Sequence, residues 1–196
     1  CGKTTLFNGL TGANQFVGNW PGVTVEKKEG KYKANKEIKI TDLPGIYSLS
    51  PYTLEEVVSR EFLLNGNVDV VLNIIDGSNL ERNLFLTTQI LELGIPTVVA
   101  INMVDVIEQR KDSIDYKKLA KELGCPVVPI SALKNKGIAE CMAEVQKAAG
   151  TNYVAKKIYT GKLESALETI ANAEPASIEE SRRFFYAVKL FERDDK

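Results

Sequence analysis

The stretch Cys1-Gly2-Lys3-Thr4-Thr5-Leu6-Phe7-Asn8 decides how the rest of this sequence is interpreted. It is typical of the second half of a phosphate-binding loop that runs into a helix, because the full pattern is Gly, four variable residues and then Gly-Lys-Ser/Thr. Gly2 lets the backbone approach phosphate oxygens, Lys3 brings positive charge to the β- and γ-phosphates, and Thr4 offers a hydroxyl to Mg²⁺. A Gly-Lys-Thr tripeptide also occurs by chance, so the interpretation depends on the rest of the chain.

The composition is that of an ordinary globular protein. The 196 residues are 44% hydrophobic and 26% charged, with a net charge of −1. A net charge close to zero gives no sign of the basic patch that nucleic-acid-binding proteins carry, so we expect no nucleic-acid partner. No uncharged apolar run approaches the roughly 18–20 residues that span a bilayer. We also predict no signal peptide, because an exported chain would not open on a phosphate loop.

The cysteines and the lack of histidine exclude two further kinds of site. Cys1, Cys125 and Cys141 have neither zinc-site spacing nor the pattern of a disulfide framework, which favours a reducing cytosolic setting. Without histidine, the chain has no base for catalysis of the Ser-His-Asp type.

The N-terminal third predicts a helix, a loop and a β-hairpin. Residues 14–24 are rich in Gly, Asn and Pro, which favours a loop. Thr53 and Glu56 have the spacing of a capping box at the start of a helix. The expected elements are a helix over 3–10, a loop over 14–24, a hairpin over 25–33 and 37–41 with its turn at Ala34-Asn35, and a helix over 54–64.

From residue 68 the pattern becomes an alternation of strands and helices. Near-continuous apolar runs are typical of buried parallel strands, and glycines end the helical stretches between them. This alternation predicts a parallel, three-layer α/β sheet with ligands at the carboxyl ends of its strands. The expected strands cover 68–75, 96–101 and 127–130, and the expected helices cover 80–93, 115–123 (with Asp115 as its cap) and 138–149.

Beyond Gly150 the strand pattern stops. A connector over 151–160 precedes a helix over 162–173, which Pro175 ends. Ser177 and Glu180 form a second capping-box pattern, which predicts a helix to about Arg193. We therefore expect a first domain over 1–150 and the beginning of a helical domain over 151–196.

Two further motifs suit the binding of Mg²⁺ and a γ-phosphate. Thr24, in the first loop, carries a hydroxyl that can reach Mg²⁺ once a γ-phosphate is present. Asp42-Leu43-Pro44-Gly45 supplies a carboxylate that can hold Mg²⁺ through water, and the Gly45 N–H can donate to the γ-phosphate. Taken alone, Asp42-Leu43-Pro44-Gly45 is also a common turn sequence, and Thr24 alone is uninformative.

Two more motifs suit the recognition of guanine. Asp105, in Asn102-Met103-Val104-Asp105, can accept both N–H groups of guanine's N1/N2 edge, which adenine does not present. Ser131-Ala132-Leu133 ends the next strand, where a backbone N–H can donate to guanine O6. Asn102 and Asp105 can alternatively cap a helix. In this order and spacing, the whole set predicts a Mg²⁺-dependent guanine-nucleotide-binding domain.

The sequence resembles the small-GTPase-like G domains and, within them, the cytosolic N-terminal G domain of FeoB-type ferrous iron transporters. The stretches that carry the resemblance are 17–30, 42–49 and 79–84, and 185–195 is similar to part of that family's helical domain. The resemblance implies a Ras-like P-loop GTPase fold. Its first strand and the first half of the phosphate loop are expected upstream of Cys1.

The resemblance also implies a set of site residues, with GTP or GDP, Mg²⁺ and K⁺ as ligands. Residues 14–24 become switch I, and the loop from Asp42 becomes switch II. The implied catalytic residues are Lys3, Thr24 and Gly45, and the implied Mg²⁺ ligands are Thr4, Thr24 and Asp42. K⁺ would be held by the carbonyls of Gly18 and Trp20 and by an upstream asparagine. The implied nucleotide contacts are Gly2, Lys3, Thr4, Thr5, Gly22, Val23, Thr24, Asp42, Gly45, Asn102, Met103, Asp105, Ser131, Ala132 and Leu133.

We expect intrinsic hydrolysis to be slow. Many GTPases carry a glutamine directly after the switch II glycine, but this position is the apolar Ile46, and switch I contains no arginine. The expected rate without a helper is about 10⁻³ s⁻¹ or below, by analogy with unassisted Ras-like enzymes. In this family K⁺ commonly plays the part of the missing arginine. An alternative interpretation of Trp20 is a surface anchor for a mobile loop.

The partners implied by the resemblance are a downstream membrane part of the same protein, which moves Fe²⁺, and small cytosolic accessory proteins. The domain would lie at the cytoplasmic face of the membrane, and the helical domain would modulate nucleotide affinity. Two alternatives stay open on the residues alone. A soluble GTPase of ribosome or RNA maturation shares the motifs but usually adds a basic domain. A nucleoside or metabolite kinase shares the phosphate loop but gives no reason for Asn102 and Asp105.

Overall fold

Three apolar runs form the parallel sheet that the sequence predicts, and the central run is buried throughout. The protein was analysed as a computed structural model that describes residues 1–13, 15–151, 159–175 and 177–194. The sheet has the strand order β4-β5-β6, and all six residues of the central strand are buried. The predicted α/β class and its parallel strands are therefore confirmed, except that the first strand begins at Val71 rather than at Val68. The strands are β4 (Val71–Asp76), β5 (Thr97–Asn102) and β6 (Val127–Pro129).

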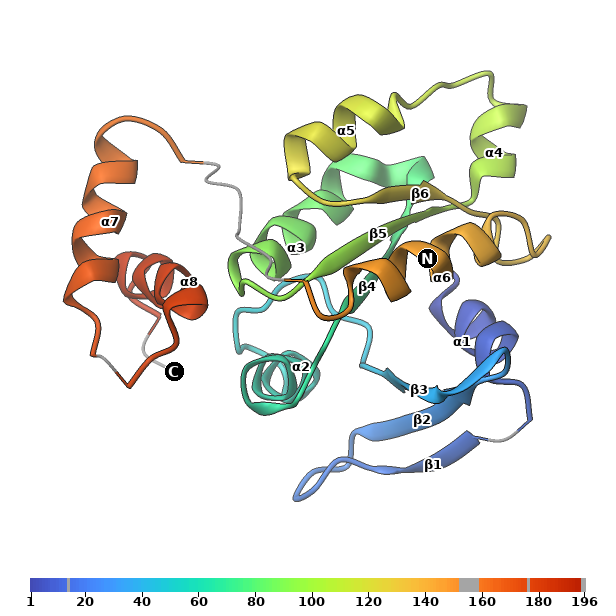
Figure 1. The fold of residues 1–196 in the computed structure, drawn as a ribbon, viewed down its shortest axis with the longest axis horizontal. Coiled ribbons are helices and arrows are strands. Elements are labelled where there is room, and N and C mark those ends of the chain that lie inside the picture. Colours follow the sequence, from blue (N-terminus) through green and yellow to red (C-terminus); the bar gives the residue numbers. More distant parts are fainter. Residues whose placement is uncertain (14, 152–158, 176, 195–196) are drawn as a thin grey trace.

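Helices cover both faces of this sheet, as Figure 1 shows. Val98 and Ala100 of β5 pack toward α1 and α6, whereas Val99 and Ile101 pack toward α3, α4 and α5, as the two-residue repeat of a strand requires. The short helix α4 was missed, because six residues carry too little periodicity to be recognised. The helices are α1 (Lys3–Thr11), α3 (Leu80–Glu92, after the 3-10 turn Gly77–Asn79), α4 (Val104–Gln109), α5 (Tyr116–Leu123) and α6 (Ile138–Ala148).

An antiparallel sheet lies beside the parallel one. The predicted hairpin is confirmed, although its turn is at Lys33-Ala34 rather than Ala34-Asn35. The prediction of a loop over 14–24 is wrong for 15–19, which pair with the hairpin as a third strand. In the described residues β3 and β4 do not pair with each other, so the two sheets are separate. The strands are β1 (Gln15–Asn19), β2 (Glu26–Tyr32) and β3 (Asn35–Asp42), in that order.

The capping box predicted for the helix after switch II is confirmed. This helix, α2 (Leu54–Asn65), begins after Thr53, whose hydroxyl accepts from the Glu56 N–H while the Glu56 carboxylate accepts from the Thr53 N–H. The cap at Asp115 is also confirmed, since its side chain accepts from the Lys118 N–H. Both helices therefore begin where the sequence places them.

The two C-terminal helices are α7 (Lys162–Ala173) and α8 (Glu180–Phe191). The predicted capping box at Ser177 is wrong: Glu179 occupies the cap position without a side-chain cap, and the Ile178 N–H instead bonds to the Pro175 carbonyl. The helix also ends at Phe191 rather than at Arg193. Most of the predicted connector over 151–160 lies outside the described residues.

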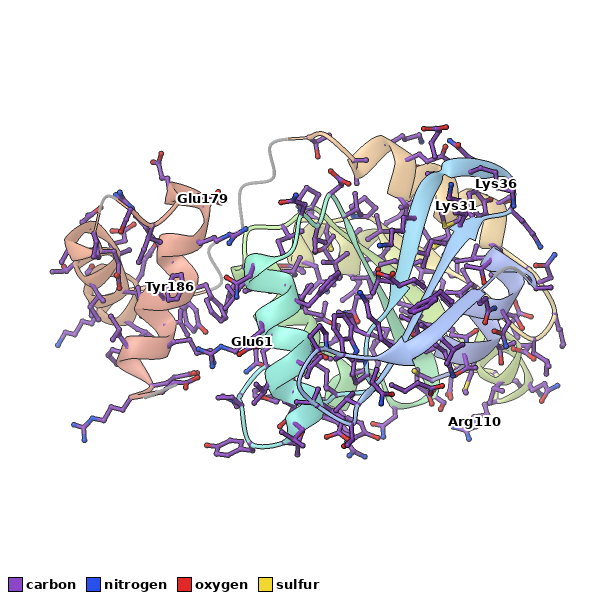
Figure 2. The ribbon with its side chains drawn as sticks, turned by 90° about the horizontal axis from the view of Figure 1, so that it is seen from below. Lys31, Lys36, Glu61, Arg110, Glu179 and Tyr186 are labelled. Carbon is purple, nitrogen blue, oxygen red and sulfur yellow. The ribbon has the colours of Figure 1, made fainter. Side chains whose placement is uncertain are left out.

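Helix α8 packs against α2 and α3. Phe185 is fully buried in a cluster with Leu49, Leu63 and Ile90, and the Arg60 guanidinium donates to the Asp194 carboxylate at 2.7 Å. Figure 2 shows Tyr186 on the side of α8 that faces α2, with Lys31 and Lys36 at the far end of the molecule. Among the described helices, none combines the length and the apolar character that crossing a bilayer requires.

Phe185→Ala should lower the free energy of unfolding by about 3–5 kcal/mol, because it leaves a cavity between α8, α2 and α3. Phe191→Ala on the same helix is the matched control, since that ring is 53% exposed, and it should change stability by less than about 0.5 kcal/mol. Urea unfolding measures both. Equal effects of the two substitutions would contradict the observed packing.

Candidate functional site

The opening residues of the chain lie against the end of β3. Lys3, in the first turn of α1, donates from Nζ to Asp42 Oδ1 at 2.5 Å and to the Leu43 carbonyl at 2.6 Å. The Asp42 side chain is largely buried, with 8% of its surface exposed. The structure therefore brings together two motifs that lie about forty residues apart, one supplying a cation and the other a carboxylate.

A pocket of about 230 Å³ lies beside this ion pair. It combines the Lys3 ammonium with the Thr4 hydroxyl and the Asp42 carboxylate. The two oxygen-bearing groups are hard ligands of the kind that suit Mg²⁺. Thr5 and Thr24 are exposed and do not line the pocket, although Val25, next to Thr24, does. The lining residues are Lys3, Thr4, Val25, Glu26, Lys28, Asp42, Leu43, Pro44 and Gly45, of which Val25, Glu26, Lys28, Leu43 and Pro44 were not among the predicted site residues.

Asn102 joins the opening stretch to the loop after β6. Its amide Nδ2 donates to the Cys1 carbonyl at 2.7 Å, and its Oδ1 accepts from the Ala132 N–H at 2.9 Å. Gly2 lies so close that an added Cβ would stand 2.4 Å from Asn102 Nδ2, and its φ of +84° is one that side chains rarely adopt. Both constraints require glycine at position 2.

Asp105 lies in the first turn of α4, and its carboxylate is 3.4 Å from the Lys134 ammonium. Desolvation raises the pKa of Asp105, but hydrogen bonds from the Ser131 hydroxyl and its own backbone N–H, together with Lys134, outweigh it and hold the pKa below its ordinary value. The carboxylate therefore stays ionised and able to accept two N–H groups. Lys134 was not foreseen, because nothing in the sequence pairs it with Asp105.

The loop after β6 has most of its donors engaged. The Ser131 N–H donates to the Lys136 carbonyl at 3.0 Å, and the Ala132 N–H donates to Asn102. Leu133 is exposed, and Met103 has a φ of +66° at the start of α4. These residues surround Asn102 and Asp105 at the carboxyl ends of β5 and β6.

Switch I is more ordered than the sequence suggests. Gly18 pairs with Lys27 across β1 and β2. The Trp20 carbonyl accepts from the Val23 N–H at 3.3 Å across a turn in which Gly22 has a φ of +78°. The Trp20 ring is buried rather than at the surface, so the alternative interpretation of an anchor is wrong about where the ring lies and not about the anchoring. In the described residues no group of three or more His, Cys, Asp or Glu side chains could hold a metal ion.

Switch II is attached to α3 by Gln89, which also has no sequence signal. Its Oε1 accepts from the Leu49 N–H at 2.8 Å and from the Ser48 hydroxyl at 3.3 Å. Ile46 packs against the same apolar cluster that contains Leu49. The residue after Gly45 therefore contributes to packing, and its side chain cannot orient a water molecule.

Solved structures with the same fold come from the cytosolic part of FeoB proteins. A GDP-bound mutant of S. thermophilus NFeoB has a TM-score of 0.94 and 49% identity, covering 98% of this chain and 76% of that chain. The mGMPPNP-bound NFeoB of S. thermophilus has a TM-score of 0.87 and 48% identity, covering 99% of this chain and 74% of that chain. The cytosolic domain of L. pneumophila FeoB has a TM-score of 0.90 and 42% identity, covering 99% and 78%. These likenesses confirm the expected Ras-like fold.

Two proteins that are similar to this chain in sequence are also FeoB proteins. The Fe(2+) transporter FeoB of Escherichia coli strain K12 is 40% identical over 198 residues, and that of Salmonella typhimurium strain LT2 is 41% identical. Each alignment covers 98% of this chain and 26% of the relative, so the chain spans about a quarter of their length. The family model for ferrous iron transport protein B matches residues 1–145. The chain belongs to the ferrous iron transport protein B (FeoB) family.

Proposed function

We propose that this chain binds GTP and GDP with Mg²⁺, hydrolyses GTP, and through its nucleotide state controls Fe²⁺ uptake by a membrane transporter. The observation that carries the proposal is the double hydrogen bond of Asn102, which joins the start of the phosphate-binding stretch to the loop after β6. Relatives at 48–49% identity are described as bound to GDP and GMPPNP, which supports a guanine nucleotide as the ligand.

Guanine would be recognised at the carboxyl ends of β5 and β6. The ionised Asp105 would accept hydrogen bonds from the N1–H and N2–H groups, which adenine does not present. The Lys134 ammonium, 3.4 Å from this carboxylate, helps to hold it in place. Asn102, Met103, Ser131, Ala132 and Leu133 form the rest of the proposed base pocket.

The phosphates would bind at the N-terminus of α1. The Lys3 ammonium would leave the Asp42 carboxylate and pair with phosphate oxygens instead. The Asp42 carboxylate would then be free to hold Mg²⁺ through water. The ion supplies charge neutralisation at the β- and γ-phosphates. Gly2, Thr4 and Thr5 serve the phosphates, and Thr4, Asp42 and Thr24 are the proposed ligands of the ion. Gly22 and Val23 of the switch I turn complete the proposed contacts.

Hydrolysis would be slow because the residue after the switch II glycine, Ile46, is apolar and cannot orient the attacking water. Ile46 packs in an apolar cluster, so Lys3, Thr24 and the Gly45 N–H remain as the proposed catalytic groups. The carbonyls of Gly18 and Trp20 are the proposed K⁺ ligands within this chain. The Trp20 carbonyl already accepts from the Val23 N–H, and its second lone pair would serve the ion.

The domain would act as the regulatory part of a larger protein at the cytoplasmic face of the membrane. We assign the G domain to residues 1–150 and the beginning of a helical regulatory domain to 151–196. A further strand upstream of Cys1 would fit between β3 and β4, which do not pair with each other in the described residues. Downstream membrane segments and small accessory proteins are the proposed partners. The family match favours this function over RNA maturation and over a kinase.

The protein that carries this chain should hydrolyse GTP and not ATP, at about 10⁻³ s⁻¹ or below in NaCl. Hydrolysis should be faster in KCl, because K⁺ neutralises charge that no arginine of switch I can neutralise. Phosphate release at equal ionic strength measures both rates. Equal rates in the two salts would remove the K⁺ proposal, and equal use of ATP would contradict the guanine pocket.

Asp105→Asn should weaken GTP binding by about 1.5–3 kcal/mol, roughly ten- to a hundredfold, because a charged acceptor of two hydrogen bonds is lost. The amide can donate to the O2 of xanthine, so the relative affinity for xanthosine nucleotides should rise. Titration calorimetry measures both affinities. Glu108→Gln, an exposed carboxylate on the same helix, is the control and should leave both unchanged. Unchanged GTP affinity in Asp105→Asn would contradict the assigned pocket.

A further inference from the structure

Trp20 attaches switch I to the helix that follows switch II. Its ring is 7% exposed and contacts Phe62 of α2, edge to face, with the ring centroids 5.1 Å apart. The Lys27 ammonium lies 4.9 Å from the centre of the Trp20 ring. The indole is therefore packed between β2 and α2, and no motif of the nucleotide site explains this packing.

The backbone of Trp20 fixes the position of Thr24. The Trp20 N–H donates to the Val25 carbonyl at 2.9 Å, and the Trp20 carbonyl accepts from the Val23 N–H. These two bonds close the turn of residues 20–25, which contains Thr24. Because Thr24 is exposed and outside the pocket lining, its hydroxyl can reach the phosphate site only if this turn moves. Such a movement would shift the Trp20 backbone and disturb the packing of its ring against Phe62.

The buried position of Trp20 carries a penalty of its own. The indole Nε1–H is buried and has no hydrogen-bond partner in the described part of the chain. Buried tryptophan N–H groups usually find a partner, and an unpaired donor costs free energy. Packing of the Trp20 ring against Phe62 therefore stabilises the buried position, whereas the unpaired Nε1–H destabilises it. A contact with such opposing contributions is suited to opening when a ligand favours another state.

We propose that Trp20 and Phe62 form a latch that holds switch I on α2 and keeps Thr24 away from the phosphate pocket. A nucleotide with a γ-phosphate draws Thr24 inward and opens the latch, whereas GDP leaves it closed. Trp20 and Phe62 are positioning residues, because their side chains do not line the pocket and act through Thr24. The latch rests on the proposed function, since it needs a GTP site beside Thr24.

Trp20 fluorescence tests the latch directly, because it is the only tryptophan of the 196 residues. The Trp20→Phe spectrum supplies the background for any longer protein that carries the chain. In the nucleotide-free protein and with GDP, emission should be blue-shifted and protected from acrylamide. A nonhydrolysable GTP analogue with Mg²⁺ should shift emission to the red and increase quenching.

Phe62→Ala should give the red-shifted, quenchable spectrum before any nucleotide is added. Leu54→Ala, an exposed residue on the same helix, is the matched control and should keep the blue-shifted spectrum. Phe62→Ala should also raise the affinity for the GTP analogue relative to GDP by about fivefold or more, because the closed latch no longer opposes the GTP state. Damage to the fold would instead weaken both nucleotides.

Two results would overturn the latch. One is an unchanged Trp20 spectrum in nucleotide-free Phe62→Ala. The other is calorimetric binding of the GTP analogue to the unaltered protein without any change in Trp20 emission, which would leave GTP binding intact. If no guanine nucleotide binds at all, the proposed function fails, and with it the nucleotide-driven opening.

Discussion

The two hydrogen bonds of the Asn102 side chain hold the site together. One bond reaches the residue before Gly2 and the other reaches the loop after β6, so one buried amide sets the distance between the phosphate end and the base end. Since Asn102 is the last residue of the fully buried strand β5, the core of the sheet determines this distance. Gly2 is constrained by the same amide, because no side chain fits beside it.

Much of the fold could be predicted because its signals are local and repeated. The buried runs of the parallel strands, the glycines that end helices, and the caps at Thr53 and Asp115 each act within a few residues. Strand β1 could not be predicted, because Phe16 and Val17 are exposed and its residues become a strand only by pairing with β2. At Ser177 the capping pattern was present, yet the bond from Ile178 to Pro175 moved the helix start two residues beyond it.

For the candidate site, the sequence identified the residue types and left out how they pair. Lys3 lies against Asp42, and Asn102 lies against Cys1 and Ala132, as ligand binding at the carboxyl ends of strands predicts, whereas Thr24 lies outside the pocket lining. The contacts of Lys134 with Asp105, of Gln89 with switch II and of Trp20 with Phe62 each join separate parts of the chain. No local pattern encodes such contacts, because they depend on how whole elements pack.

Under the proposed function, the ion pair between Lys3 and Asp42 would affect nucleotide release. When phosphates leave, the Asp42 carboxylate, 2.5 Å from the Lys3 ammonium, would pair with it in their place. The partly buried Lys3 ammonium would then not be left without a counterion. A site that supplies its own counterion lowers the electrostatic penalty of being empty. Under the proposed function, spontaneous exchange of one nucleotide for another would then depend less on an external exchange factor.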